Sequence, residues 1–195
     1  MRSRIVRPAR PAVRRSQRRA TGALAWWALL AGALATLPAR ADGPAVRAPA
    51  LSGREWINSA PLTPDSLAGR VVLVEFWAFE CVNCRRTVPA MKRLHAMYRD
   101  SADVVIVGVH TPELPQEHGR KAVERAVADL GLRYPILVDD RMVNWDAFEN
   151  RYWPALYVVD RRGVIRDVEA GELHEGTLEW RSLLTLITRL RRESR

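Results

Sequence analysis

Two short apolar runs with a helical segment between them dominate the middle of the chain. Residues 71–76 and 104–109 are rich in β-branched side chains and contain almost no polar positions, which is typical of parallel strands that are covered on both faces. Between the runs, apolar residues recur at helical spacing, at Val88, Met91, Leu94 and Tyr98. The pattern therefore predicts a β-α-β unit.

The segments that follow predict a mixed sheet. They alternate between helical and strand-like patterns and end in a hairpin and a helix, at residues 116–130, 136–138, 142–150, 155–159, 164–168 and 177–192. Gly131 ends the predicted helix over 116–130. The turn-like Asp160-Arg161-Arg162-Gly163 joins the two strands of the hairpin. This order predicts an α/β fold with a central mixed β-sheet flanked by helices on both faces. A strand and a helix are inserted before the hairpin.

The first 41 residues have the three-part pattern of an export signal. Residues 1–20 are basic, residues 20–37 are uncharged and apolar, and Pro38-Ala39-Arg40-Ala41 supplies small residues in an A-x-A arrangement. We expect cleavage after Ala41 and an exported, periplasmic or other extracytoplasmic protein. An uncleaved anchor is the alternative, because about 18 residues span about 27 Å against a hydrocarbon core of about 30 Å. Residues 42–53 are interpreted as a linker, and residues 54–192 as the domain.

Charge is distributed unevenly along the 195 residues. The net charge of +9 would suggest a nucleic-acid or membrane-surface binder if it were spread over the fold. Nine arginines, however, lie within residues 1–41, and the rest of the chain carries 22 of the 31 basic residues against all 22 acidic ones. A neutral domain has no surplus of cations to displace counterions from phosphates, so nucleic acid is not an expected partner. The length suits one domain with appendages.

The chain contains only two cysteines, Cys81 and Cys84, separated by Val82-Asn83. They follow a predicted buried strand and open a predicted helix. The first sulfur then faces free backbone N–H groups at the positive end of the helix dipole, which stabilises a thiolate and lowers its pKa. The second sulfur lies one turn further on, within reach of a mixed disulfide on the first. We therefore predict dithiol redox chemistry, with the Cys81–Cys84 disulfide as the redox group and no other cofactor.

Other uses of a cysteine pair fit less well. A structural zinc site needs four ligands, and the histidines at 95, 110, 118 and 174 lack the spacing that would complete one. A c-type haem would need histidine at position 85, which is Arg85. A structural disulfide is possible in an exported protein, although a cross-link that closes only a four-residue loop at a helix start would stabilise the fold little. No metal site is predicted.

Several segments resemble the thioredoxin superfamily. Residues 74–84 are similar to its strand and active-site segment, Pro89 matches the proline that kinks its first helix, and residues 153–163 are similar to its cis-proline loop, strand and turn. Residues 108–113 and 145–154 narrow the resemblance to exported TlpA/ResA-like proteins, and to the C-terminal domain of DipZ-type proteins. The resemblance covers about residues 54–192 and implies a thioredoxin-like fold. Glu80 and Val82-Asn83 depart from the usual residues, so the redox potential stays open.

The resemblance also implies roles. Cys81 would be the nucleophile and Cys84 the resolving thiol. Glu75 matches the family's buried acid and would take the proton from Cys84; a core carboxyl paired with a lysine or arginine is the alternative. Pro154, as a cis-proline, would lie against the cysteines and dock an extended substrate strand, or else be an ordinary trans proline.

Four further side chains belong to the predicted surroundings of the site. Trp77 and Trp153 are expected to wall it, although each could be a core residue. His110 and His118 are expected to have a structural hydrogen-bonding role rather than a catalytic one.

These features predict a thiol-disulfide oxidoreductase of the extracytoplasmic space, and the resemblance to TlpA/ResA-like proteins implies that it reduces protein disulfides. The resemblance implies a membrane electron donor of the DipZ/CcdA type, and we expect a monomer. The alternative is a thiol peroxidase of peroxiredoxin type. Peroxiredoxins carry threonine three residues before the reactive cysteine, where this chain has Ala78, which argues against that activity. A non-catalytic binding module is disfavoured by the intact cysteine pair.

Overall fold

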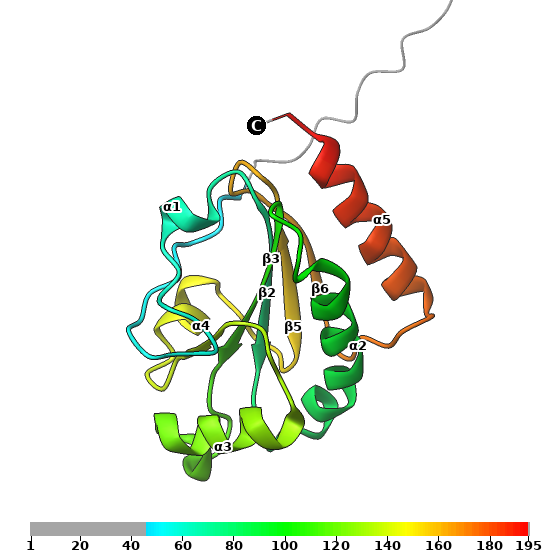
Figure 1. The fold of residues 1–195 in the computed structure, drawn as a ribbon. Helices are drawn as coiled ribbons and strands as arrows, with labels where there is room; N and C mark the ends of the chain where they lie inside the picture. Colours follow the sequence, from blue (N-terminus) through cyan, green and yellow to red (C-terminus); the bar gives the residue numbers. More distant parts are fainter. Residues whose placement is uncertain (1–45, 195) are drawn as a thin grey trace, which may run out of the picture. The chain divides into compact units, whose positions relative to one another are not determined.

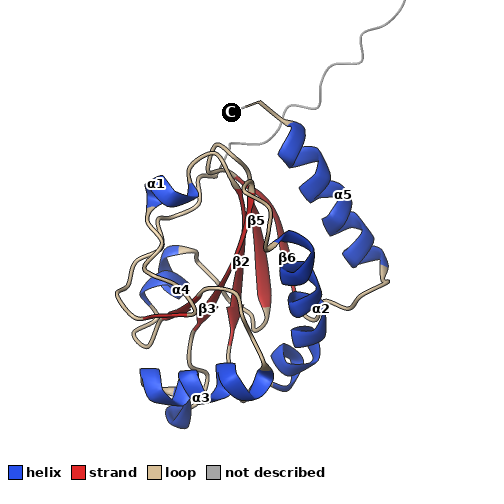
Figure 2. Cartoon of the chain, in the orientation of Figure 1, coloured by secondary structure: helices blue, strands red, loops and turns tan. Residues whose placement is uncertain are grey.

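The computed structural model describes residues 46–194, and the predicted export signal lies outside this range. The described chain forms a six-stranded sheet in the order β1-β4-β3-β2-β5-β6 (Figures 1 and 2). β2 and β4 run parallel to β3, whereas β5 is antiparallel to both β2 and β6, and β1 is antiparallel to β4. The predicted mixed sheet is confirmed. The strands are β1 (Trp56–Ile57), β2 (Val71–Trp77), β3 (Val104–His110), β4 (Ile136–Val138), β5 (Ala155–Val159) and β6 (Ile165–Ala170).

Helices cover both faces of the sheet, as predicted. In Figure 1, α2 and α5 lie on one side and α1 and α4 on the other. Leu73 of β2 belongs to the core cluster that includes Met91 of α2 and Ile187 of α5, whereas Phe76 of the same strand packs with Trp145 of α4. All seven residues of β2 are therefore buried. The helices are α1 (Pro64–Leu67), α2 (Val82–Tyr98), α3 (Arg120–Leu130), α4 (Val143–Ala147) and α5 (Leu178–Arg192), with a 3₁₀ helix η1 (Pro115–Glu117).

Some local details differ from the sequence prediction; for example, α1 was not predicted, and α4 is shorter than the helix expected over 142–150. The single helix expected over 116–130 is divided into η1 and α3, with the break at Gly119, whose φ of 90° lies in the region that favours glycine. β1 was not predicted, because a two-residue strand is too short to show a period. It forms through pairing of Trp56 with Leu137 of β4.

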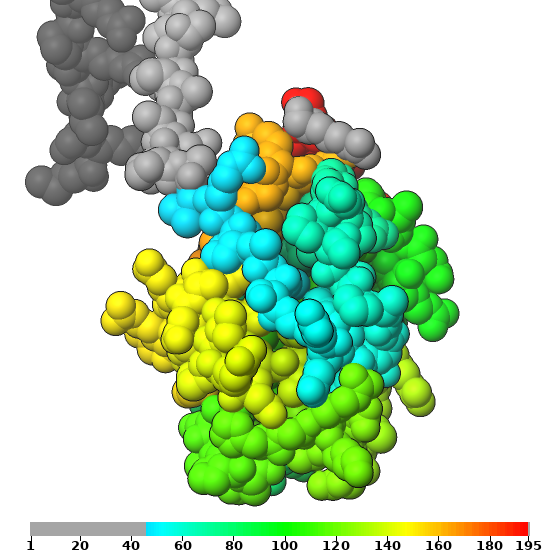
Figure 3. All heavy atoms as spheres, turned by 90° about the vertical axis from the view of Figure 1, so that its left-hand side faces the viewer, coloured from blue at the N-terminus to red at the C-terminus, as the bar shows by residue number. Residues whose placement is uncertain are grey.

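Residues 46–53, part of the predicted linker, pack on the domain. The backbone N–H of Ala48 donates to the Gly163 carbonyl at 2.9 Å, and that of Ser52 donates to the Asn144 side chain at 2.7 Å. In the space-filling view, this cyan segment lies on the surface beside the yellow residues around α4 (Figure 3). Within the described residues, no helix is both long enough and apolar enough to cross a membrane.

The strand registers bring three segments to one edge of the sheet. Trp77 at the end of β2 pairs with His110 at the end of β3, and Phe76 pairs with Ala155 at the start of the antiparallel β5. The loop that leads to Cys81, the loop after β3 and the residues just before β5 therefore meet at this edge.

Candidate active site

Cys81 is the N-cap of α2, at the edge of the sheet where β2 ends. Its Sγ accepts a hydrogen bond from the backbone N–H of Cys84 at 3.4 Å, so the first sulfur faces the helix start as predicted. Both cysteines are free thiols. Cys81 is 9% exposed and Cys84 is 1% exposed, which makes Cys81 the more accessible of the two.

The loop before β5 lies against Cys81. The Trp153–Pro154 peptide bond is cis, which confirms that prediction, and the Cys81 thiol lies 3.8 Å from the Trp153 carbonyl oxygen. The Trp153 ring stacks on Trp145 at 3.9 Å, and its Nε1–H donates to the Thr111 carbonyl at 3.0 Å. These two contacts fix the indole, and with it the carbonyl that faces the nucleophile.

Trp77 lies beneath the site. It is 2% exposed and belongs to the core cluster that contains both cysteines. Its ring meets His110 edge to face, with ring centroids 5.1 Å apart. Trp77 is therefore a core residue at the end of β2, whereas the Trp153 backbone contacts Cys81.

Glu75 is a buried carboxyl on β2, and its partner is a tyrosine. The Tyr134 hydroxyl donates to Oε2 at 2.9 Å. No ion pair of Glu75 with a lysine or arginine is found among residues 46–194. Burial raises the pKa of Glu75 to about 7, and the bond from Tyr134 opposes this rise.

Cys84 is the more deeply buried of the two thiols. Burial raises its pKa far above the ordinary value, and the neighbouring Cys81 and the charge of Glu75 act in the same direction. A carboxyl with a pKa near 7 is half ionised at neutral pH and can accept a proton there. The arrangement therefore places a thiol with a raised pKa where it feels the charge of a carboxyl that can accept a proton near neutral pH.

The hydrogen-bonding role expected for His110 is wrong. His110 is fully buried, stacks on Phe79 at 5.3 Å, and has no hydrogen-bond partner for either ring nitrogen among the described residues. His118 is exposed, and the role expected for it stays a prediction. The nearby loop amides of Glu113 and Leu114 bond to a carboxylate instead. His110 acts as an aromatic packing group.

That carboxylate belongs to Glu117, which the sequence did not reveal. Glu117 is fully buried, and its Oε1 accepts the backbone N–H of Glu80, 37 residues away, at 2.8 Å. The Glu80 side chain itself is exposed. The sequence gives no signal for the bond to Glu80, because that donor lies 37 residues away.

The opposed pKa shifts of Glu75 and His110 predict a specific pH dependence of stability. Burial lowers the pKa of His110 to about 4, so protonation of the unfolded chain makes the free energy of unfolding fall as pH drops from 6.5 to 4. The raised pKa of Glu75 has the opposite effect, because stability is then lost as pH rises from 4.5 to about 7. In the wild type the two effects largely cancel over their shared window.

Replacing Glu75 with glutamine should expose the histidine effect. We expect the free energy of unfolding of Glu75→Gln to rise by about 3 kcal/mol between pH 4 and 6.5, measured by urea unfolding at fixed pH values. His110→Phe removes the histidine effect and leaves that of Glu75, so its free energy of unfolding should fall as pH rises from 4.5 to 7. Parallel curves for both variants and the wild type would contradict these two assignments.

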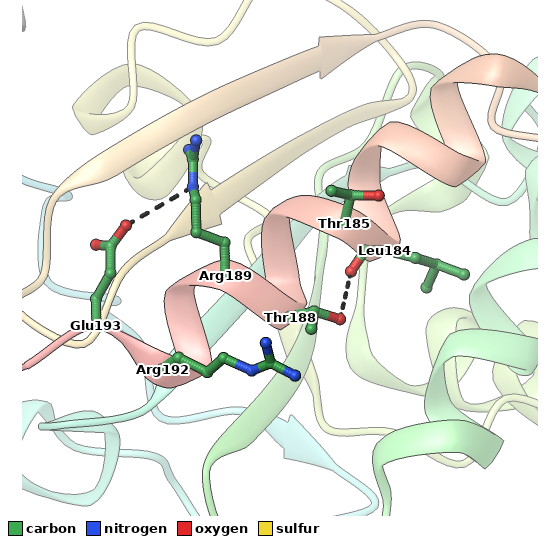
Figure 4. Close-up of a pocket in the computed structure, with 6 residues that line it drawn as sticks. All are labelled: Leu184, Thr185, Thr188, Arg189, Arg192 and Glu193. Carbon is green, nitrogen blue, oxygen red and sulfur yellow. Dashed lines mark hydrogen bonds and ion pairs between the residues drawn. The ribbon is translucent and has the colours of Figure 1, made fainter.

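Other features of the surface lie outside this site. A hollow on the outer side of α5 is lined by Leu184, Thr185, Thr188, Arg189, Arg192 and Glu193 (Figure 4). Its internal contacts are an Arg189–Glu193 ion pair at 3.7 Å and a bond from the Thr188 hydroxyl to the Leu184 carbonyl at 2.8 Å. None of its residues belongs to the loops around Cys81. Within residues 46–194, no group of three or more His, Cys, Asp or Glu side chains is placed to hold a metal ion.

Comparisons with known proteins agree with this geometry. The AhpC/TSA family model matches residues 44–168. Protein DipZ of Mycobacterium bovis is 40% identical over 129 residues, which are 64% of this chain but only 18% of DipZ. Thiol-disulfide oxidoreductase YkuV of Bacillus subtilis is 31% identical over 124 residues, 63% of this chain and 82% of YkuV.

A solved structure supports the fold independently. The crystal structure of a thioredoxin-like superfamily protein superposes with a TM-score of 0.69 at 24% identity and covers 77% of this chain and 99% of that protein. At this identity the likeness concerns the fold alone. The chain therefore belongs to the AhpC/TSA family, as a thioredoxin-fold member related to thiol-disulfide oxidoreductases.

Proposed function

We propose that this thiol-disulfide oxidoreductase reduces disulfides of protein substrates outside the cytoplasm. The observation that carries the proposal is the position of Cys81, at the start of α2 and 3.8 Å from the carbonyl that precedes the cis-proline. The more exposed sulfur thus meets helix N–H groups on one side and a substrate-docking loop on the other.

The exchange proceeds in two displacements that balance in atoms and electrons. The Cys81 thiolate attacks one sulfur of the substrate disulfide, forms a mixed disulfide and expels the first substrate thiolate. Cys84 transfers its proton to Glu75 and attacks the Cys81 sulfur, which releases the second substrate thiolate. The substrate disulfide gains two electrons, and the Cys81–Cys84 pair becomes a disulfide.

Substrate docking is assigned to the loop before β5. An extended chain can form backbone bonds along such a loop, as in strand addition to a sheet edge. Two exposed apolar side chains are available nearby for contact with the substrate. Val82 follows the nucleophile directly and is 57% exposed, and Tyr152 precedes Trp153 and is 60% exposed.

The extracytoplasmic location rests on the sequence, and the reducing direction rests on the resemblance to TlpA/ResA-like proteins. Residues 1–41 have the pattern of an export signal, and an oxidised Cys81–Cys84 pair must be reduced again before another turnover. The similarity to DipZ suggests a membrane electron donor of the DipZ/CcdA type as the source of these electrons. Such a donor would reduce the disulfide by the reverse exchange.

Two assays on the purified full chain separate this function from peroxide reduction. With dithiothreitol as the electron source, we expect catalytic reduction of insulin disulfides. Consumption of hydrogen peroxide should not exceed that of Cys81→Ser, because Ala78 occupies the position where peroxiredoxins carry threonine. Rapid peroxide consumption without insulin reduction would overturn the proposal.

A further inference from the structure

Glu117 joins two loops that surround the reactive cysteine. Its Oε1 accepts the backbone N–H of Glu80, the residue directly before Cys81, at 2.8 Å. Its Oε2 accepts the backbone N–H groups of Glu113 and Leu114 at 2.7 and 2.8 Å. A single fully buried carboxylate thus ties the loop before α2 to the loop after β3.

The charge of Glu117 is held by backbone groups alone. No ion pair of Glu117 with lysine, arginine or histidine is found within the described part of the chain. A buried carboxylate is costly unless its oxygens are hydrogen-bonded, and short bonds from N–H groups to an ionised oxygen are among the stronger ones. Since all three donors are loop amides, the same bonds that solvate the carboxylate also fix the two loops.

The loop after β3 also reaches the other side of Cys81. Thr111 lies two residues before Glu113, and its backbone N–H donates to the Trp77 carbonyl at 3.0 Å. Its own carbonyl accepts the Trp153 indole N–H at 3.0 Å, and the Trp153 carbonyl lies 3.8 Å from the Cys81 thiol. Glu117 therefore connects to Cys81 along two routes, one through Glu80 and one through Thr111 and Trp153.

We propose that Glu117 is a positioning residue for the first displacement, in that it holds the Glu80–Cys81 backbone in register with the Trp153–Pro154 docking loop. The proposal rests on the exchange chemistry described above. It does not depend on which disulfide the protein reduces in the cell. A misplacement of about 1 Å at a reacting group can cost about 100-fold in rate, so a loose Glu80 loop should be visible in the attack of Cys81.

Glu117→Gln tests the proposal, because the amide keeps the shape but presents N–H groups to at least one of the loop donors. The probe is 5,5′-dithiobis(2-nitrobenzoate), a small aromatic disulfide that releases a coloured thiolate. In full-length protein that also carries Cys84→Ser, Cys81 forms a mixed disulfide with one half of the probe and expels the other half as thiolate. The release rate therefore reports the first displacement alone, and we expect it to fall at least about 10-fold.

Asp160→Asn is the matched control. Asp160 is also a buried carboxylate that holds a loop, since its Oδ1 accepts the backbone N–H groups of Arg162 and Val164 at 2.9 Å. It lies after β5, at the opposite end of that strand from Pro154. Asp160→Asn should lower the melting temperature and leave the first displacement unchanged, when both variants are assayed well below their melting temperatures.

The outcomes separate positioning from mere stability. A folded Glu117→Gln protein that reacts as fast as Asp160→Asn would overturn the proposal. If Glu117→Gln does not fold, Glu117→Asp decides, because it keeps the charge but reaches less far and should also slow the first displacement. A wild type that reduces the aromatic probe but not insulin would contradict the proposed function and leave the role of Glu117 testable.

Discussion

Replacing Cys84 with serine is expected to arrest the protein as covalent adducts with its substrates, and insulin reduction should fall to background. Formation of the mixed disulfide needs only Cys81, whereas its resolution needs the second thiol. Cys81→Ser should also lose all turnover but trap little. The remaining Cys84 is 1% exposed, and burial raises its pKa far above the ordinary value, so little thiolate is available for attack.

The adducts can be isolated and identified from cells that express each variant. Non-reducing gels should show bands with Cys84→Ser that disappear on reduction and are absent when Cys81→Ser and Cys84→Ser are combined. Mass spectrometry then identifies the trapped proteins. We expect these to be exported proteins. Equal trapping by both single variants would overturn the assignment of nucleophile and resolving thiol, and adducts with cytoplasmic proteins alone would contradict the extracytoplasmic location.

The parts of the fold that depend on local pattern were predictable from the sequence. β2 and β3 are apolar at nearly every position because helices cover both faces of the sheet. A cysteine pair placed directly after such a strand must then open the next helix, and the structure has Cys81 as its N-cap. The cis bond at Pro154 was predictable only through family resemblance, since no spacing rule distinguishes a cis from a trans proline.

The parts that depend on distant contacts were not predictable. In the sequence Glu117 resembles an ordinary polar residue of a helix over 116–130. In the structure its side chain is buried and accepts the backbone N–H of Glu80. The sequence predicts a hydrogen-bonding His110 in the loop after the second inner strand, whereas His110 is the last residue of β3. In the structure its imidazole instead contacts the rings of Phe79 and Trp77, and neither ring nitrogen has a partner among the described residues.

Replacing Glu75 with glutamine is expected to slow resolution by Cys84 by a factor of about 10²–10⁴, the usual contribution of a general base. The amide has the shape of the carboxyl and can still accept the Tyr134 hydroxyl, but it cannot take a proton from Cys84. The first displacement uses Cys81 and should be unchanged. Release of the second thiolate from the aromatic disulfide probe measures resolution, and release of the first measures attack.

The pH profile shows whether Glu75 acts as a base. With its pKa at about 7, the wild-type resolution rate should rise with pH as the carboxyl ionises and level off above pH 7, and Glu75→Gln should lack this inflection. Tyr134→Phe removes the hydrogen bond that favours the charged carboxylate, so its inflection should move to higher pH. Asp160→Asn, which replaces a buried carboxyl at the opposite end of β5 from Pro154, should keep the wild-type profile.

These variants separate a catalytic carboxyl from a structural one. A structural Glu75 would lower the melting temperature when replaced but leave the resolution rate and its pH profile intact in the folded protein. A Tyr134→Phe profile identical to the wild type would show that another group titrates near pH 7. The base assignment stands only if Glu75→Gln loses the inflection and Tyr134→Phe shifts it, because only an ionising carboxyl that is hydrogen-bonded to Tyr134 responds to both changes in this way.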